Sequence, residues 1–386
     1  MEAQKRESCK YSNLEDKMTI TDNEDLLIEI LLYLPAKTLI RFKLVSKKWF
    51  FIISGRHFSR RHSQHRHRLS KLESSFLLRC LGDSPEYLYL QSKLQPQKSV
   101  RYHFSPSLID PTIWSFSNGL FLLVNSSTID EPLEYCHIYN PTTKQSKKIP
   151  LNTHERFTFV IGLNLAFDPL KSPYYHIVCV RATRKRRPPS FLRGWYRYCQ
   201  IEVYESGTDT WQLCGEPFLV PRDVDFNHGV YWEGGIHWDG IYFDLLESSI
   251  CKHPELVELP EDAGIKNFQN NYVESNGSLH YMAHFSEENL VMVFELQSNC
   301  SQWLLKYRIN LERGSEPLSV LSFIRGESEV DSMLVLCEPG KVIGYQIGEK
   351  SVKELVDFTE EQFYKAQCVQ FGSHSTFQFI ETLAPV

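Results

Sequence analysis

The sequence has no long apolar run, no paired cysteines and no large excess of charge of either sign. No segment approaches the roughly 18 consecutive apolar residues of a membrane-spanning helix. The ten cysteines include no Cys-x-x-Cys pair and no Cys/His set at zinc spacing, so we expect reduced, mostly buried thiols and no metal. A net charge of -5 gives no general attraction for nucleic acid.

Catalytic motifs with a recognisable spacing are also missing. We find no Gly-x-Gly-x-x-Gly, no Walker loop and no Gly-x-Ser-x-Gly, and His154-Glu155 lacks the second histidine of a His-Glu-x-x-His site. The sequence therefore predicts a protein that is not an enzyme and uses no cofactor. Residues 1–20 are polar and lack the apolar core of a signal peptide, so we expect a cytoplasmic or nuclear location.

What the sequence does contain is two kinds of pattern in succession. The chain has 386 residues, 42% of them hydrophobic and 13% aromatic, which is enough for more than one folded unit. Helical spacing comes first, and short alternating runs typical of strands follow. We therefore predict a disordered N-terminus (1–20), a helical module (21–60), a basic linker (61–72) and a strand-rich domain (73–386).

The helical module shows the pattern of three short helices. Thr21 and Glu24 form a capping-box pattern, which predicts a first helix from about Asp22. The apolar residues of this helix cover nearly its whole circumference. Pro35 suits the first turn of a second helix, and a third apolar face contains Trp49. A unit of about 40 residues cannot bury so much apolar surface alone, so we expect a permanent partner.

These residues resemble the F-box. The matching segments are Asp25-Leu26-Leu27-Ile28-Glu29-Ile30-Leu31, Leu34-Pro35-Ala36-Lys37-Thr38-Leu39 and Val45-Ser46-Lys47-Lys48-Trp49. The resemblance implies docking on a Skp-family adaptor and, through it, on cullin and RING subunits. The residues expected to contact the adaptor are Leu26, Leu27, Ile30, Leu31, Leu34, Pro35, Leu39, Val45 and Trp49.

One departure from the F-box pattern is that Asp22-Asn23 stands where the family has Leu-Pro. Adaptor binding should therefore depend mainly on the Leu34-Pro35 junction and on the helix that carries Trp49. The alternative is that these apolar residues only tie an N-terminal helical hairpin to the rest of the chain.

In the strand-rich domain an apolar strand that ends in Tyr or Phe, followed by polar turn residues, recurs six times. The aromatic residues are separated by 50, 65, 39, 51 and 51 residues, and they are Tyr89, Tyr139, Tyr204, Phe243, Phe294 and Tyr345. A period near ~50 residues in a strand-rich chain is typical of a kelch-like β-propeller, here with six blades and the aromatic residues in their cores. We expect residues 376–380 to close the ring against Phe76-Leu77-Leu78.

Further segments resemble the kelch-type F-box-associated domain of plant F-box proteins. They are Asn140-Pro141-Thr142-Thr143-Lys144-Gln145, Leu165-Ala166-Phe167-Asp168-Pro169 and Phe226-Asn227-His228-Gly229-Val230-Tyr231-Trp232. The resemblance implies a substrate-recognition subunit of an SCF-type (cullin-RING) E3 ubiquitin ligase. The target protein would be bound by propeller loops, for which the candidates run from Arg181 to Arg193 and from Glu258 to Asn271.

Two other kinds of binding stay open. In a lectin-like receptor, exposed Trp195, Trp232 and Trp238 would stack on sugar rings. In a nucleic-acid binder, the loop from Arg181 to Arg193, with Trp195 and Tyr196, would contact phosphates and bases, although four adjacent basic residues are more typical of a solvated loop or an import signal.

Overall fold

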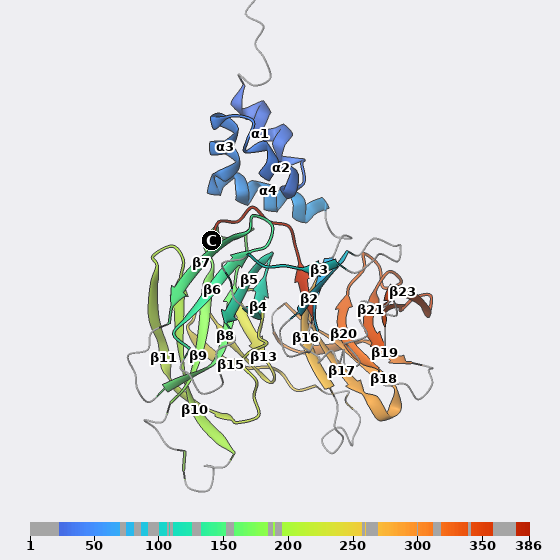
Figure 1. The fold of residues 1–386 in the computed structure, drawn as a ribbon. Helices are drawn as coiled ribbons and strands as arrows, with labels where there is room; N and C mark the ends of the chain where they lie inside the picture. The colour runs from blue at the N-terminus through green and yellow to red at the C-terminus, as the bar shows by residue number, and fades with distance from the viewer. Residues whose placement is uncertain are drawn as a thin grey trace, which may run out of the picture.

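The structure is a computed structural model that describes residues 23–69, 75–80, 86–91, 100–105, 108, 111–125, 133–151, 158–183, 188–189, 195–256, 259, 269–298, 300–311, 318–338, 341–357 and 376–386. Four helices are followed by a β-propeller (Figure 1). In this view the helices stand above the strands, and the C-terminal residues pass between the two parts. No helix in the described ranges is long and apolar enough to cross a membrane.

The helical module contains four helices: α1 (Glu24–Leu32), α2 (Ala36–Phe42), α3 (Lys47–Ser54) and α4 (Arg56–Leu69). The prediction of three helices was therefore wrong. The stretch expected to be a basic linker is helical as far as Leu69, because Phe58 and His62, one turn apart, are both buried. His62 Nε2 lies 2.8 Å from the Leu34 carbonyl oxygen, which ties α4 to the end of α1.

The starts of α1 and α3 are set by side-chain caps. The Asn23 side chain accepts a hydrogen bond from the Leu26 N–H at 3.2 Å, so α1 begins at Glu24 rather than at Asp22 as predicted. The Ser46 hydroxyl caps α3 in the same way through the Trp49 N–H. Asn23 thus does the work of a helix cap at the place where the F-box pattern has Leu-Pro.

The described strands form six four-stranded antiparallel sheets, named A to F in chain order. Sheets A to C consist of β24 (Thr376–Phe379), β1 (Ser75–Cys80), β2 (Glu86–Gln91) and β3 (Val100–Tyr102); β4 (Pro111–Ser117), β5 (Leu120–Asn125), β6 (Tyr135–Asn140) and β7 (Gln145–Pro150); β8 (Thr158–Ala166), β9 (His176–Thr183), β10 (Tyr196–Glu205) and β11 (Thr210–Pro221).

Sheets D to F follow the same up-and-down order. They consist of β12 (Val230–Trp232), β13 (Gly235–Trp238), β14 (Ile241–Asp244) and β15 (Ser249–Lys252); β16 (Gln269–Ser275), β17 (Ser278–Phe285), β18 (Leu290–Leu296) and β19 (Trp303–Asn310), with a 3-10 turn η2 (Ser286–Glu288); β20 (Ser319–Ile324), β21 (Met333–Glu338), β22 (Lys341–Gln346) and β23 (Ser351–Asp357).

Each copy of the six-fold sequence motif falls in the third strand of a different sheet: β2, β6, β10, β14, β18 and β22. Hydrophobic clusters fill the spaces between successive sheets from A to F, and the described motif aromatics lie in them. Tyr139, Tyr204, Phe243 and Phe294 are buried, as predicted. The repeat is therefore a packing repeat, which supplies one aromatic side chain to each sheet.

The first strands of neighbouring sheets are joined by hydrogen bonds that repeat at an interval of about 50 residues. The Leu165 N–H donates to the Ser115 hydroxyl, and the Arg325 N–H donates to the Ser275 hydroxyl, both at 2.9 Å. The side-chain amide of Asn164 spans the wider gap to sheet D, donating to the Phe226 carbonyl at 2.8 Å. These first strands therefore form the inner wall of the ring.

The ring closes by pairing of the last strand with the first one. Strand β24 runs antiparallel to β1, with Leu77 opposite Phe377 and Leu78 opposite Thr376. This pairing confirms the predicted closure of the ring. Covering an edge in this way also removes an unpaired strand from solvent.

Beyond β24, residues 380–386, called here the C-terminal segment, connect the propeller to the helical module. Leu383 packs in the core of the module with Leu27, Leu31 and Leu39. The buried side-chain amide of Asn140 donates to the carbonyls of Thr382 and Ala384 at 3.1 and 2.8 Å. The C-terminal segment therefore packs against both the helical module and the propeller.

Helix α4 makes a second connection to the propeller. The Arg60 guanidinium donates to the Leu170 carbonyl at 3.1 Å, in the turn between β8 and β9. The Arg56 guanidinium lies 5.0 Å from the centre of the Tyr174 ring in the same turn. The module therefore rests on the propeller at two places and not through a single flexible link.

Candidate functional site

A first candidate site is the apolar surface that the helical module leaves exposed. Of the predicted contact residues, Leu26 and Ile30 are each 44% exposed and Val45 is 59% exposed. Pro35 is exposed as well, and Leu34 is half-buried. Leu26 and Ile30 are four residues apart and therefore share one face of α1. Part of the predicted set is thus available to a partner.

The remaining predicted contact residues lie inside the module. Leu27, Leu31 and Leu39 are buried in its core, where they pack with one another and with Leu383. Trp49 is half-buried, and its ring meets Phe42 edge to face at a centroid distance of 5.4 Å. These side chains hold the shape of the surface, and they contact one another in the isolated chain.

The structure also shows exposed apolar residues that the sequence pattern did not single out. Leu44 lies in the turn after α2, and Phe50 and Phe51 lie within α3. All three side chains are exposed. Half of the large hydrophobic residues found exposed in the described ranges belong to the helical module. Exposed large apolar side chains that gather in one small unit are typical of an interaction site, so the helical module is a candidate docking unit.

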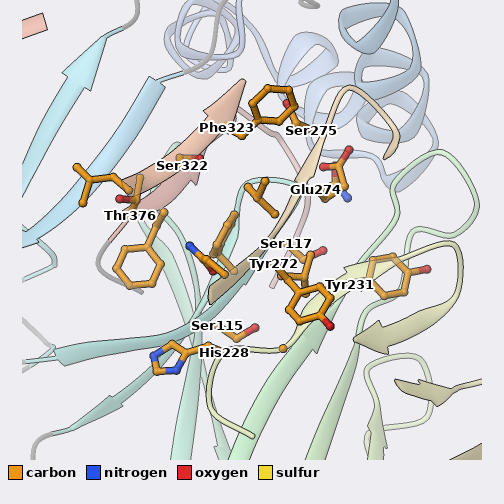
Figure 2. Close-up of a pocket in the computed structure, with 18 of the residues that line it drawn as sticks. Ser115, Ser117, His228, Tyr231, Tyr272, Glu274, Ser275, Ser322, Phe323 and Thr376 are labelled. Atoms are coloured by element: carbon orange, nitrogen blue, oxygen red, sulfur yellow. The ribbon is translucent and has the colours of Figure 1, made fainter. Parts of the chain in front are cut away.

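A second candidate site is a cavity in the central channel of the propeller. It is lined by the first strands of sheets B, D, E and F and by β24 (Figure 2). Its walls are mainly aromatic and aliphatic, with hydroxyl and amide groups among them. The labelled lining residues are Ser115, Ser117, His228, Tyr231, Tyr272, Glu274, Ser275, Ser322, Phe323 and Thr376.

Of the lining residues that the structure describes, Glu274 alone carries a carboxylate. Its Oε1 accepts a hydrogen bond from the Gly277 N–H at 2.8 Å, in the turn that joins β16 to β17. Burial raises the pKa of this carboxyl group, and the nearby Asp168 carboxylate acts in the same direction. No cationic side chain pairs with Glu274 within the described residues.

His228 lies at the other end of the labelled group in Figure 2. Its Nδ1 is 2.8 Å from Asp225 Oδ2, which fixes the orientation of the imidazole ring. Thr376, in β24, has a buried hydroxyl oxygen without a hydrogen-bond partner in the part of the chain described. The channel thus combines apolar walls with a few polar groups, which is typical of ligand-binding cavities.

The tryptophans expected to be exposed divide into two groups. Trp195 is exposed, but Trp232 and Trp238 are buried, and their indole N–H groups donate to the carbonyls of Gly277 and Phe226. The lectin-like use of Trp232 and Trp238 was therefore wrong, because both rings pack in the sheet cores.

The basic loop expected to contact nucleic acid is described only in part. Residues 184–187 and 190–194 lie outside the described residues, as do 258 and 260–268 of the other predicted loop. Arg181 is buried and forms an ion pair with Glu202 at 2.9 Å, between β9 and β10. Arg181 is thus a structural residue of sheet C, contrary to the prediction.

Cysteine and histidine side chains show no arrangement typical of a metal centre within the described residues. None of the described cysteines forms a disulfide with another described cysteine. Cys136, Cys179, Cys199 and Cys337 are buried. Burial raises the pKa of the Cys199 thiol to about 11, which makes it a poor nucleophile at neutral pH. Four of the seven cysteines with described side chains are thus buried, in line with the expectation of mostly buried thiols.

Comparison with solved structures finds only distant likenesses. The β-propeller domain of the Trilobed protease from Pyrococcus furiosus matches 75% of this chain and 94% of its own, at 10% identity and a TM-score of 0.37. An oligogalacturonate lyase from Vibrio parahaemolyticus matches 72% of each chain, at 8% identity and a TM-score of 0.39. At these scores the likenesses add nothing to the functional assignment.

Comparison with sequence families is more informative. The F-box domain model matches residues 23–61, which cover α1 to α3 and the start of α4. The putative F-box/kelch-repeat protein At1g12870 of Arabidopsis thaliana is 23% identical over 75% of this chain and 71% of its own. The F-box protein At5g07610 of the same plant is 30% identical over 95% of this chain and 93% of its own. The protein therefore belongs to the plant F-box protein family.

Proposed function

We propose that this protein is the substrate-recognition subunit of an SCF-type (cullin-RING) E3 ubiquitin ligase. The observation that carries the proposal is the exposed apolar surface of the F-box, held on a closed propeller by the C-terminal segment. The F-box would bind a Skp-family adaptor and, through it, the cullin and RING subunits. The propeller would bind the target protein.

In this role the protein acts by positioning. Holding a target close to the loaded ubiquitin-conjugating enzyme raises the effective concentration of its lysines, so the receptor itself needs no catalytic residue. Two separate connections between the module and the propeller favour this role, because a rigid receptor keeps the target at a fixed distance from the ligase. Such ligases work in the cytoplasm or nucleus, where we place the protein.

The adaptor would contact α1, the turn after α2, and α3. Leu26, Ile30, Pro35 and Val45 supply exposed apolar area, and Leu34 and Trp49 border it. Leu27, Leu31 and Leu39 would act indirectly, by keeping this surface in shape. Burying an exposed Leu, Ile or Val contributes about 1.5–3 kcal/mol, so a few such residues can carry a specific interface.

The direct test is binding of a purified Skp-family adaptor to the full chain and to Val45→Asp. A carboxylate in an apolar interface should weaken binding at least about tenfold, because the charge loses its water there. Leu246→Asp is the matched control, since Leu246 is 89% exposed in the turn after β14, on the propeller. Equal adaptor binding by both variants and the unchanged protein would contradict the proposal.

Replacing Trp49 is a less selective test of the same surface. Because its ring packs on Phe42, Trp49→Ala would disturb the fold of the module as well as the interface. Val45→Asp avoids this difficulty, since the Val45 side chain is exposed already. Affinity purification from cells with the proteasome inhibited should then recover adaptor, cullin and a stabilised target together.

A further inference from the structure

We propose that the central channel of the propeller recognises a lysine or arginine side chain of the target, with its aliphatic stem against the aromatic wall and its cationic head at Glu274. This inference rests on the proposed function and names the chemistry by which a target is recognised. It uses the cavity of Figure 2 and none of the residues assigned to adaptor binding.

The charge of the channel favours a cation. Among the described lining residues there is no lysine or arginine, and Glu274 is the one carboxylate. Asp168, in the turn after β8, is near enough to raise the pKa of both Glu274 and the lining residue Tyr231. Acidic groups near an apolar cavity without a compensating cation repel anionic ligands and attract cationic ones.

Glu274 is the group that a ligand would complete. From the residues that the structure describes, its side chain accepts one hydrogen bond, from the Gly277 N–H, whereas a carboxylate can accept about four. Two other carboxylates of this propeller with low exposure have cationic partners: Glu295 pairs with Arg325 and Lys306, and Glu202 pairs with Arg181. An ammonium or guanidinium group entering the channel would give Glu274 the counter-ion that the described part of the chain does not supply.

The walls suit the rest of such a side chain. Tyr231, Tyr272 and Phe323 line the same cavity, and aromatic faces attract lysine and arginine heads as well as their apolar stems. The cavity offers about 80 Å³ to the centres of water molecules, several times the ~10–15 Å³ that one water needs. A slender side chain fits this space better than a folded segment.

Recognition of a cationic side chain can be tested by measuring peptide binding to the purified complex of the full chain with its adaptor. The probes are capped pentapeptides of alanine with a central lysine, arginine, norleucine or glutamate. Norleucine keeps the aliphatic stem of lysine and lacks the ammonium group. A charge-assisted contact predicts that the lysine and arginine peptides bind at least about tenfold more tightly than the norleucine peptide.

Glu274→Gln should bring the lysine-to-norleucine ratio close to one. The amide keeps the size of the side chain and the acceptor for the Gly277 N–H, so the fold is retained. Glu287→Gln is the matched control, because Glu287 is exposed in the turn η2 of the same part of the chain and should leave the ratio unchanged.

Three results would overturn the inference: equal binding of the lysine and norleucine peptides, tighter binding of the glutamate peptide, or no binding of any peptide. Butylammonium tests whether a free amine suffices. If it bound as tightly as the lysine peptide, the site would serve a small amine and not a target side chain. Adaptor binding measured on the same samples separates failure here from failure of the proposed function.

Discussion

The helical module and the propeller bury their apolar residues in different ways. Each sheet of the propeller packs on its neighbours through a repeated aromatic position, and the ring is completed by β24 from its own domain. The module leaves Leu26, Ile30 and Val45 exposed and takes Leu383 into its core from the other end of the chain. The propeller is thus closed in itself, whereas the module takes part of its core from the C-terminal segment and leaves apolar side chains exposed.

Among the changes that test this difference between the module and the propeller, deletion of residues 381–386 should have the largest effect. The deletion removes Leu383 from the module core and both carbonyl partners of Asn140 from the interface. Loss of a buried leucine alone costs about 2–5 kcal/mol, so we expect the module to lose its ordered structure. Adaptor binding measured by titration should fall at least about a hundredfold. Adaptor binding unchanged by the deletion would show that the module folds independently.

Acid should act on the propeller directly. Burial lowers the pKa of His237 to about 3 and that of His280 to about 4, whereas an unfolded chain has histidine pKa values near ~6.5. The unfolded state therefore binds protons that the folded state refuses, and stability falls as the pH drops from about 6.5 toward 4. Each of these buried histidines costs about 2 kcal/mol at pH 5 relative to neutral pH.

Denaturant unfolding of the full chain at pH 7, 6 and 5 measures this loss. His280→Phe should flatten the pH dependence, because a neutral ring of similar size keeps the packing against Phe323. A pH dependence as steep as that of the unchanged protein would mean that His280 is not responsible.

Two glycines in equivalent turns allow the contribution of the C-terminal segment to stability to be measured separately from that of the turn itself. Gly119 and Gly277 both follow an asparagine in a turn between the first two strands of a sheet, with φ of 86° and 80°. A Cβ at Gly119 would lie 2.3 Å from the Ile380 carbonyl oxygen, whereas a Cβ at Gly277 would meet nothing within 4 Å. Gly277→Ala should cost about 1–2 kcal/mol from its positive φ.

Gly119→Ala should cost at least about 1 kcal/mol more than Gly277→Ala, because it also pushes the C-terminal segment away. Thermal unfolding of the two variants checks the difference. Equal losses would mean that the C-terminal segment moves aside without affecting stability.

Asn140 and Asp244 form a second matched pair with a smaller expected effect. Both residues end the third strand of a sheet and accept two N–H bonds from the following turn. Only Asn140 also donates to the C-terminal segment, and it is buried. Asn140→Ala should cost about 1–3 kcal/mol, and Asp244→Ala about 1 kcal/mol or less. Similar losses in chemical denaturation would argue against a special role for Asn140.

The parts of the fold that follow a period in the sequence could be predicted. Helices α1 to α3 follow from apolar spacing and Pro35, and the six sheets follow from the recurring aromatic motif. The closure by β24 could be predicted too, because residues 376–379 alternate as a strand does. In each case a local pattern determines the element.

Features that depend on contacts between distant residues were missed. Helix α4 was taken for a linker because its buried face is built from Phe58 and His62 within a strongly basic stretch. Leu383 lies in a tail without periodicity, more than 300 residues from the helices that it packs on. The central channel is formed only when the ring closes, so the position of Glu274 on its wall could not be inferred from spacing.

The most direct test of the dependence of the module on the C-terminal segment is amide hydrogen exchange across α1 to α3 in Leu383→Asp. If the module needs Leu383, protection in these helices should fall at least about a hundredfold, while the strands of sheets C to E keep their protection. Leu246→Asp, the same change at an exposed site, should leave both regions protected. Full protection of α1 to α3 in Leu383→Asp would show that the module does not depend on the C-terminal segment.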